Sequence, residues 1–404
     1  MPAPLWRNRD FILLQAGQLL STFGSGISGI AYPLLTLAVT GSAAKAGYVG
    51  AVEFAPLLLF SLPAGVAADR FDRRRVMIAS DIGGAAAVGA LAALALTHHV
   101  TLYAILVVAF VDMTASVFFR AGNSGAFRAV VPQSQLADAS SLSMGRASVV
   151  RLGSPPVGGA LFGLARSLPF LADAVSYAFS TVSLLLMRTR FQEEREPQEK
   201  THLREGLVYF WQMPFLRVTV AMIAVSNFAA TGVPLALIVL ARRHGISGAG
   251  VGALIALTGA ATLLGSLLSP VCRRFIPMRA ILLSEYWMAG VYAMFIAFPN
   301  VYVLAGALAL HAFTFPNTDS AVAAYSYTLI PDRLLGRAMA ASNTLRVAVT
   351  PLGPLATGLL LSHTSARITV LVLAAPVVVA AALGTMSPSM RNLPTLGASP
   401  ATAD

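Results

Sequence analysis

The chain of 404 residues contains a single cysteine, Cys272. One cysteine excludes a disulfide framework and a metal site built from cysteines. The six histidines are scattered without the spacing of metal ligands, so no metal site is expected. Glycine-rich stretches such as Gly24-Ser-Gly26 lack the lysine of a phosphate-binding loop, which leaves ATP hydrolysis unsupported. The sequence therefore predicts neither an enzyme nor a cofactor.

Charge is also scarce, because charged residues make up 11% of the chain against about 25% in soluble domains. Hydrophobic residues make up 56% and lie in long blocks such as 82–96 and 370–383, and the mean hydropathy is +0.73. The alternating ten-residue segments of a membrane β-barrel are absent. No cleavable signal peptide is expected, since residues 11–20 contain two glutamines and run on into a full-length segment. The sequence therefore predicts an all-α integral membrane protein embedded in the lipid bilayer.

The net charge of +11 does not indicate a nucleic-acid partner. The arginines lie in short connections between apolar blocks, where they orient membrane helices. Their concentration in alternate connections predicts that both termini are cytoplasmic, in a multi-pass protein of the bacterial cytoplasmic membrane. The pair Arg242-Arg243, on the expected outer side, is a local exception.

Twelve segments are long enough to span a bilayer, which needs about 20 apolar residues. They are 10–38, 46–69, 76–97, 100–122, 136–165, 168–187, 214–241, 249–272, 279–298, 301–327, 336–363 and 366–386. The predicted domains are an N-terminal six-helix bundle (1–188), a central cytoplasmic loop (189–213), a C-terminal six-helix bundle (214–386) and a disordered cytoplasmic tail (387–404).

The two halves repeat each other. The stretch Val131-Pro132 with Leu136, Ser143, Pro155 and Gly159 matches Ile330-Pro331 with Leu335, Ser342, Pro354 and Gly358 at a spacing of 199. A glycine followed by arginines ends the second span of each half, at Gly65 to Arg75 and at Gly265 to Arg274. Such a parallel duplication is typical of secondary transporters.

The segment Gly65-x-x-x-Asp69-Arg70-x-x-Arg73-Arg74 resembles the diagnostic loop motif of the major facilitator superfamily, with Asp72 in place of its second glycine. Val131-Pro132-x-x-x-Leu136-Ala137 and Pro331-Asp332-x-Leu334-x-Gly336-Arg337 resemble its drug- and siderophore-exporting branch, which has macrolide-efflux-like members. The resemblance implies two pseudo-symmetric six-helix bundles that work by alternating access, functional as a monomer.

In that superfamily the loop motif is a conformational latch. The resemblance implies the same role here for Gly65, Asp69, Arg70, Arg73, Arg74 and Asp81. We expect Gly65 to permit tight helix packing and Asp69 to cap the helix that starts near Leu335. We expect one of the arginines to pair with Asp81. Topological charge alone is the alternative.

The fifth span carries Pro155, Gly158 and Gly159, which resemble the core of a motif associated with exporters. Small residues and proline predict a kinked, closely packed face that seals the cavity on the outer side. Simple helix packing is the alternative.

Ionisable residues inside spans usually face the bundle interior. The candidate proton or substrate carboxylates are Glu53, Asp112 and Asp319, and the intramembrane cations are Arg146, Arg151 and Arg346. The estimated depths of Asp112 and Arg151 are similar, so the two are expected to pair. Glu53 has no obvious neighbour in the sequence, which favours proton exchange or attraction of a cationic drug.

Further polar candidates lie on the helices that form the central cavity in the superfamily. They are Gln15, Gln18, Asn123, Asn227 and Asn317. Together the features predict a proton-driven exporter of hydrophobic or amphiphilic small molecules such as drugs, antibiotics or siderophores, with the proton gradient in place of a cofactor. The alternatives are a metabolite importer or facilitator and, more distantly, a non-transporting sensor or assembly partner.

Overall fold

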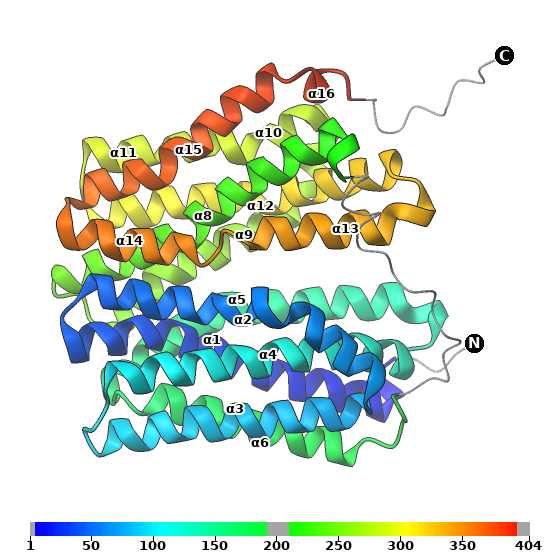
Figure 1. Ribbon diagram of the computed structural model, residues 1–404, viewed down its shortest axis with the longest axis vertical. Helices are drawn as coiled ribbons and strands as arrows, with labels where there is room; N and C mark the ends of the chain where they lie inside the picture. The colour runs from blue at the N-terminus through cyan, green and yellow to red at the C-terminus, as the bar shows by residue number, and fades with distance from the viewer. Residues whose placement is uncertain (1–4, 192–209, 394–404) are drawn as a thin grey trace. The chain divides into compact units, whose positions relative to one another are not determined.

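The computed structural model describes residues 5–191 and 210–393, and within these ranges every regular element is a helix (Figure 1). The N-terminal helices are α1 (Arg9–Thr40), α2 (Ala43–Arg70), α3 (Arg73–Leu96), α4 (Leu102–Val130), α5 (Leu136–Leu164) and α6 (Leu168–Leu186). The later ones are α8 (Pro214–Arg243), α9 (Gly248–Phe275), α10 (Met278–Met288), α11 (Tyr292–Ala297), α12 (Val301–Leu329), α13 (Asp332–Val347), α14 (Leu352–His363), α15 (Ala366–Met386) and α16 (Pro388–Arg391). Three short 3₁₀ turns complete this set, namely η1 (Leu5–Arg7), η2 (Gln133–Gln135) and η3 (Ala289–Val291).

Helices begin and end where the sequence supplies capping residues. Gly41 ends α1 in the left-handed conformation (φ 65°), which a residue without a Cβ adopts without strain. Ser42 then accepts a hydrogen bond from the Lys45 amide at the start of α2. Asp72 accepts one from the Arg75 amide and is the N-cap of α3. The aspartate that replaces a motif glycine therefore starts the next helix.

Each of the twelve predicted segments coincides with one helix or with an interrupted pair. The ninth is divided into α10 and α11 by η3, and the eleventh is divided into α13 and α14 by a break at residues 348–351. Ten helical segments of the described chain are long and apolar enough to cross a membrane. The other two, α5 and α12, have 29 residues each and are not among these ten. The count of twelve spans and the placement of the termini stay predictions.

The chain divides into two compact units. Unit 1 comprises Met1–Pro197, Ile238–Ala256 and Pro354–Ser362, and unit 2 comprises Gln198–Leu237, Leu257–Gly353 and His363–Asp404. Unit 1 therefore combines α1 to α6 with the last residues of α8, the first residues of α9 and most of α14. The predicted division into halves at the central loop remains a prediction, and most of that loop lies outside the described residues.

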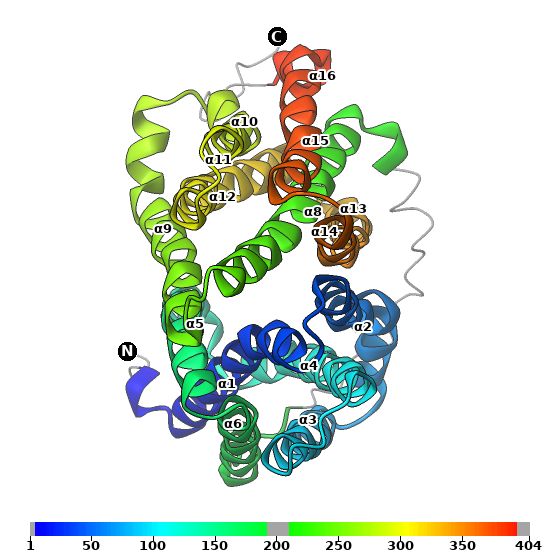
Figure 2. The same ribbon diagram turned by 90° about the vertical axis from the view of Figure 1, so that its left-hand side faces the viewer.

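Within unit 1, α1 is the central helix and contacts α2, α4, α5 and α6 (Figure 2). Its close approach to α6 depends on small residues. A Cβ added at Gly24 would collide with the Ser176 side chain, and one added at Gly17 would press on Ser183. Small residues of this kind let membrane helices approach closely, and here they bring the polar faces of α1 and α6 together.

Within unit 2, α10 packs on α12 and α15, and α11 packs on the same two helices. Two glycines mark close contacts. A Cβ at Gly265 of α9 would collide with the Phe313 carbonyl of α12, and one at Gly384 of α15 would lie 2.7 Å from the Met222 sulfur of α8. Gly265 of the second motif copy is thus closely packed.

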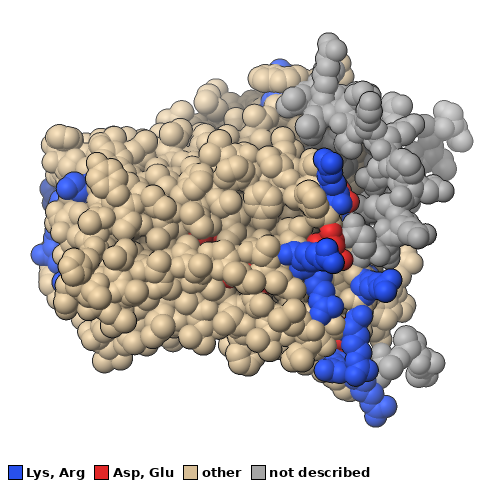
Figure 3. All heavy atoms as spheres, turned by 60° about the horizontal axis from the view of Figure 1, so that its bottom comes forward, with Lys and Arg blue, Asp and Glu red and all other residues tan. Residues whose placement is uncertain are grey.

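The surface has the charge pattern of a membrane protein. On the face shown in Figure 3, most lysine and arginine side chains lie in separate clusters, with a broad surface that carries few of them between the clusters. At the C-terminal end, part of the predicted disordered tail is ordered: residues 388–391 form α16, and Met390 is fully buried. Residues 394–404 lie outside the described part of the chain.

Candidate functional site

A buried carboxylate held by two tyrosines lies in the interior of unit 1. Asp112 of α4 is 8% exposed. Its Oδ2 accepts a hydrogen bond of 2.9 Å from the Tyr32 hydroxyl of α1, and its Oδ1 accepts one of 2.7 Å from the Tyr177 hydroxyl of α6. No arginine forms an ion pair with Asp112 among the described residues. One carboxylate therefore joins three helices through neutral donors.

The polar network continues beyond Tyr177. Ser25 of α1 donates to the Tyr177 oxygen (3.3 Å) and lies 3.5 Å from Oδ1 of Asp173 on α6. Ser176 donates a hydrogen bond of 3.2 Å to the same Oδ1 of Asp173. Asp173 is completely buried. Two buried aspartates are therefore connected through a serine and a tyrosine.

Glu53 of α2 faces the same region. Its Oε1 lies 3.8 Å from the position that a Cβ would take at Gly29 of α1, and its carboxyl is within electrostatic range of Asp112. The sequence suggested no neighbour for Glu53, and the fold supplies this one. Three carboxyl groups thus lie in one part of the unit.

The predicted pair of Asp112 and Arg151 is not formed. Arg151 is exposed, whereas Asp112 points into the unit towards Tyr32 and Tyr177. The helix rise fixes the depth of a residue but not the direction in which its side chain points. Similar depth was therefore insufficient to predict contact.

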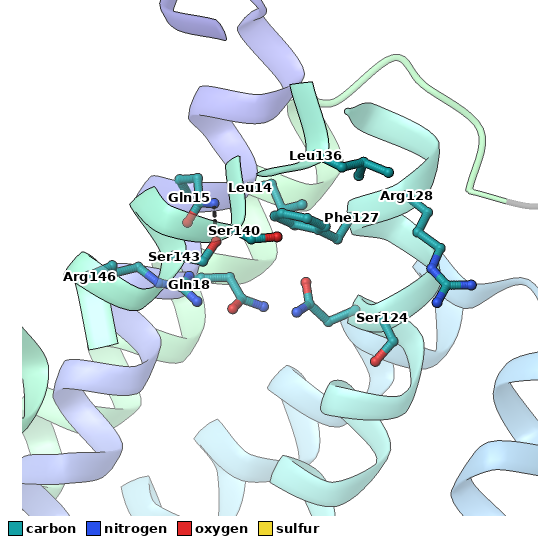
Figure 4. A pocket seen from close by; sticks show the side chains of 11 residues that line it. Leu14, Gln15, Gln18, Ser124, Phe127, Arg128, Leu136, Ser140, Ser143 and Arg146 are labelled. Atoms are coloured by element: carbon teal, nitrogen blue, oxygen red, sulfur yellow. Dashed lines mark hydrogen bonds between the residues drawn. The ribbon is translucent and has the colours of Figure 1, made fainter. Parts of the chain in front are cut away.

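A cavity of about 420 Å³ lies between α1, α4 and α5 (Figure 4). Three predicted cavity residues line it, namely Gln15, Gln18 and Asn123, and so does Arg146. Leu14 and Phe127 add an apolar wall. The cavity volume is in the range of small-molecule sites, which combine apolar walls with a few placed polar groups.

Several polar atoms of this cavity have spare hydrogen-bonding capacity. The Gln15 amide donates to Ser143 at 2.8 Å and is thereby held in place (Figure 4). The Oδ1 of Asn123 and the Nε and Nη1 of Arg146 are buried without a hydrogen-bond partner in the part of the chain that the structure describes. Buried polar groups are usually satisfied, so these atoms are suited to a bound solute or water.

In unit 2, the candidate acid and cation pair with each other. Arg346 of α13 donates to Asp319 of α12 at 3.1 Å, and the Asp319 side chain is 54% exposed. Asn227 of α8 donates to the Arg346 carbonyl at 2.8 Å, and Asn317 donates to the Gly265 carbonyl at 3.4 Å. Asn227 and Asn317 thus bind backbone groups.

Two further polar pairs of unit 2 were not predicted. Glu285 of α10 is 4% exposed and accepts a hydrogen bond from Ser226 of α8. His311 of α12 lies 3.2 Å from the Tyr292 hydroxyl through Nδ1. Glu285 could have been found from the sequence repeat, because Ser284-Glu285 in the second half corresponds to Ser80-Asp81 in the first. Among the described residues, no cluster of acids, histidines and cysteine is suited to a metal ion.

The predicted latch is partly assembled within unit 1. Arg73 forms an ion pair with Asp69 (3.6 Å) and donates to the carbonyls of Ala68 and Phe191. Arg74 donates to the Leu185 carbonyl, and Arg70 lies over the Phe71 ring at 6.0 Å. Arg73 and Arg74 therefore both connect the loop to the end of α6 and the residues that follow it. The capping of the helix near Leu335 by Asp69 stays a prediction.

Two expectations for the latch are not met. Asp81 is completely buried beside Ser180, and no arginine pairs with it among the described residues, because Arg73 and Arg74 point to carbonyl groups instead. A Cβ at Gly65 would meet no atom within 4 Å, so this glycine does not serve close packing here. The close contact belongs to its repeat, Gly265.

The glycines of the fifth span make close backbone contacts. A Cβ at Gly159 would collide with the Gly248 carbonyl of α9, and one at Gly158 would lie 2.8 Å from the Ile27 carbonyl of α1. A second crossing joins α2 to α14, where a Cβ at Gly358 would lie 2.7 Å from the Cα of Gly47. Pro155 lies at the first crossing, that of α5 with α9, where its carbonyl would collide with a Cβ at Gly252.

These two crossings are related by the sequence repeat. Gly159 and Gly358 are 199 positions apart, and Gly47 and Gly248 are 201 apart. Close by, Arg243 donates to the Leu361 carbonyl at the C-terminal end of α14 (3.0 Å). A cation at a helix C-terminus is stabilised by the exposed carbonyls, which accounts for the exception to the charge pattern.

Relatives and structural neighbours agree with this architecture. The chain is 26% identical over 399 residues to the multidrug efflux pump Tap of Mycolicibacterium fortuitum, covering 95% of this chain and 96% of the relative. It is 24% identical over 207 residues to macrolide efflux protein A of Streptococcus pyogenes, covering 50% and 51%. The crystal structure of a bacterial homologue of the human lysosomal transporter Spinster matches the fold with a TM-score of 0.74 at 16% identity, covering 96% and 98%.

The family model described as Major Facilitator Superfamily matches residues 15–346. The apolar helices identify a multi-pass protein of the bacterial cell membrane, and the family is one of transporters of small molecules rather than of enzymes. With most of its length matched, the chain belongs to the Major Facilitator Superfamily.

Proposed function

We propose that the protein is a proton-coupled exporter of hydrophobic or amphiphilic small molecules. The observation that carries the proposal is the buried Asp112 carboxylate, which has two tyrosine donors and no ion pair with any described residue. A carboxylate without a paired cation is able to take up and release a proton during a transport cycle. The names of the two efflux relatives support export of drugs, antibiotics or related compounds.

Protonation of Asp112 has a structural consequence in this proposal. The ionised carboxylate accepts from Tyr32 and Tyr177, whereas the protonated group has one donor of its own. One phenol must then reverse its hydrogen bond or move away. Loading a proton therefore changes the bonding of α4 to α1 or α6, and this links the proton to helix movement.

The cavity lined by Gln15, Gln18 and Asn123 is the substrate site in this proposal. Its amides and the free atoms of Arg146 orient polar groups of the solute, and Phe127 and Leu14 contact its apolar part. The ion pair of Asp69 and Arg73 then acts as the inner latch and the two glycine crossings act as the outer seal, in a protein that functions as a monomer.

The test is transport into inside-out membrane vesicles with an acid lumen, with a panel of radiolabelled or fluorescent drugs. An exporter driven by protons accumulates substrate, and a protonophore abolishes the accumulation. Uptake into right-side-out vesicles with the opposite dependence on the gradient would favour the importer alternative. Absence of flux for every compound under any gradient would favour a sensor.

A further inference from the structure

A second cavity, of about 990 Å³, lies in unit 2 between α8 and α15. Its walls are apolar and include Val218, Ala221, Val225, Pro376, Val379 and Leu383. Val379 and Leu383 are 56% and 64% exposed, so the cavity is an open groove on the side of the helices. The volume is at the upper end of the range for small-molecule sites.

One end of this groove is polar. Arg217, one turn into α8, lines it together with Ser387, Ser389 and Asn392 at the end of α15 and beyond. Arg217 is exposed, and its side chain has no hydrogen bond or ion pair with any described residue. Among the described residues, no acidic side chain lines the groove. The groove is therefore amphiphilic, with the Arg217 cation at one end.

The polar end lies at the level where α15 leaves the apolar region. The Trp287 indole donates to the Thr385 hydroxyl at 3.0 Å. Arg279 and Arg391 both donate to the Thr385 carbonyl, at 3.1 and 3.3 Å. Tryptophan and arginine at a helix end are typical of the boundary between lipid and water. Arg217 is thus close to a membrane surface, which the charge pattern predicts to be the cytoplasmic one.

We propose that this groove binds a phospholipid with an anionic headgroup from the surrounding bilayer. Its acyl chains lie along Val218, Val225 and Val379, and its phosphate pairs with Arg217. An apolar wall that ends at the interface in a cation without an ion-pair partner among the described residues matches the two parts of such a lipid. Anionic lipids of the cytoplasmic leaflet occupy basic pockets of this kind between membrane helices.

The test is native mass spectrometry of the purified full-length protein, titrated with phosphatidylglycerol and, separately, with phosphatidylcholine. The wild type is expected to retain phosphatidylglycerol in preference. Arg217→Ala is expected to weaken that binding about tenfold, since it removes a charge-assisted hydrogen bond. Arg217→Lys keeps a cation and is expected to retain most of it. The control is Arg367→Ala, which removes an exposed arginine at the other end of α15 and leaves the affinity unchanged.

A second variant tests the apolar part. Ala380→Trp places a large ring in the groove wall and is expected to reduce phosphatidylglycerol binding while the protein remains monodisperse in detergent. Equal binding of the two lipids, or unchanged binding in both Arg217→Ala and Ala380→Trp, overturns the proposal. So does full displacement of the lipid by inorganic phosphate, which would assign the site to a free anion.

Discussion

The Tyr177 hydroxyl of α6 donates a hydrogen bond of 2.7 Å to the Asp112 carboxylate of α4, across 65 positions of the sequence. The same tyrosine oxygen accepts from Ser25 of α1. Tyr177 therefore contacts both other helices of the network. In the proposed mechanism, a change in the proton content of Asp112 reaches α6 through Tyr177, and it reaches α1 both through Tyr177 and directly through Tyr32.

Asp112→Asn is expected to abolish proton-driven accumulation in inside-out vesicles, because an amide of the same shape cannot take up the proton. Counterflow exchange, which needs no net proton movement, is expected to persist. The control is Asp138→Asn, an exposed acid at the start of α5. Normal accumulation by Asp112→Asn would remove Asp112 from the proposed mechanism.

Tyr177→Phe is expected to destabilise the protein by about 1–3 kcal/mol, since the buried carboxylate loses a donor. The loss is measurable as a lower unfolding temperature in detergent, together with slower transport. Tyr103→Phe removes an equivalent hydroxyl from α4 at a position that is 80% exposed, and it should change neither quantity. Equal effects of the two substitutions would contradict the network.

Glu53→Gln and Asp319→Asn are expected to differ. Glu53 lies within electrostatic range of Asp112, so its neutralisation should weaken pH-driven accumulation. Asp319 is half-exposed and paired with Arg346, and such pairs contribute only about 0–1 kcal/mol. Asp319→Asn should therefore leave most of the transport intact. The initial rate of transport, measured at several lumen pH values, distinguishes the two variants. If Asp319→Asn loses pH-driven accumulation and Glu53→Gln keeps it, then Asp319 rather than Glu53 takes part in the coupling to protons.

Asp69→Asn is expected to reduce transport while membrane insertion stays normal. The substitution removes the charge that pairs with Arg73 but keeps the side-chain shape. Arg73→Lys should be almost as harmful, because one ammonium group cannot reproduce the guanidinium contacts with Ala68 and Phe191. Immunoblots of membrane fractions measure insertion. If Asp69→Asn is not inserted, the motif acts only through topology.

Gly159→Leu is expected to impair transport strongly, because its side chain meets the backbone of α9. Overpacking of this kind typically costs about 1–3 kcal/mol. Gly163→Leu is the matched control on the same helix, since a Cβ there has no atom within 4 Å. Transport assays and unfolding temperatures of both variants test the crossing, and equal behaviour would show that α5 tolerates bulk at either glycine.

The sequence was sufficient to predict the helices. The length of each apolar segment and the residues that interrupt it, such as Gly41 and Asp72, fix where a helix begins and ends. The break inside the eleventh segment was missed, although Pro351 lies there. Proline is frequent in membrane helices, so its presence alone did not indicate a break.

The side-chain partners were harder to predict. Gln15 and Gln18 were predicted because they lie on a helix that forms the central cavity in the superfamily, and both line the same cavity. Tyr32 and Tyr177 were missed because a tyrosine in an apolar segment is treated as an apolar residue on account of its ring. In the structure, the hydroxyl of each tyrosine donates a hydrogen bond to Asp112. Their meeting with Asp112 depends on how α1, α4 and α6 are rotated, and a single sequence does not specify this rotation.

If the glycine crossings form the outer seal, as proposed, their geometry determines how that end opens. Backbone atoms in direct contact have no flexible side chain between them to follow a small displacement. Dispersion attraction falls by a quarter to a half when a gap of about 0.5–1 Å forms. Such a contact is either complete or lost, and intermediate separations are poorly stabilised. We therefore expect opening at Gly159 and Gly358 to be an abrupt event rather than a gradual widening, visible in single-molecule distance records as two levels with few values between them.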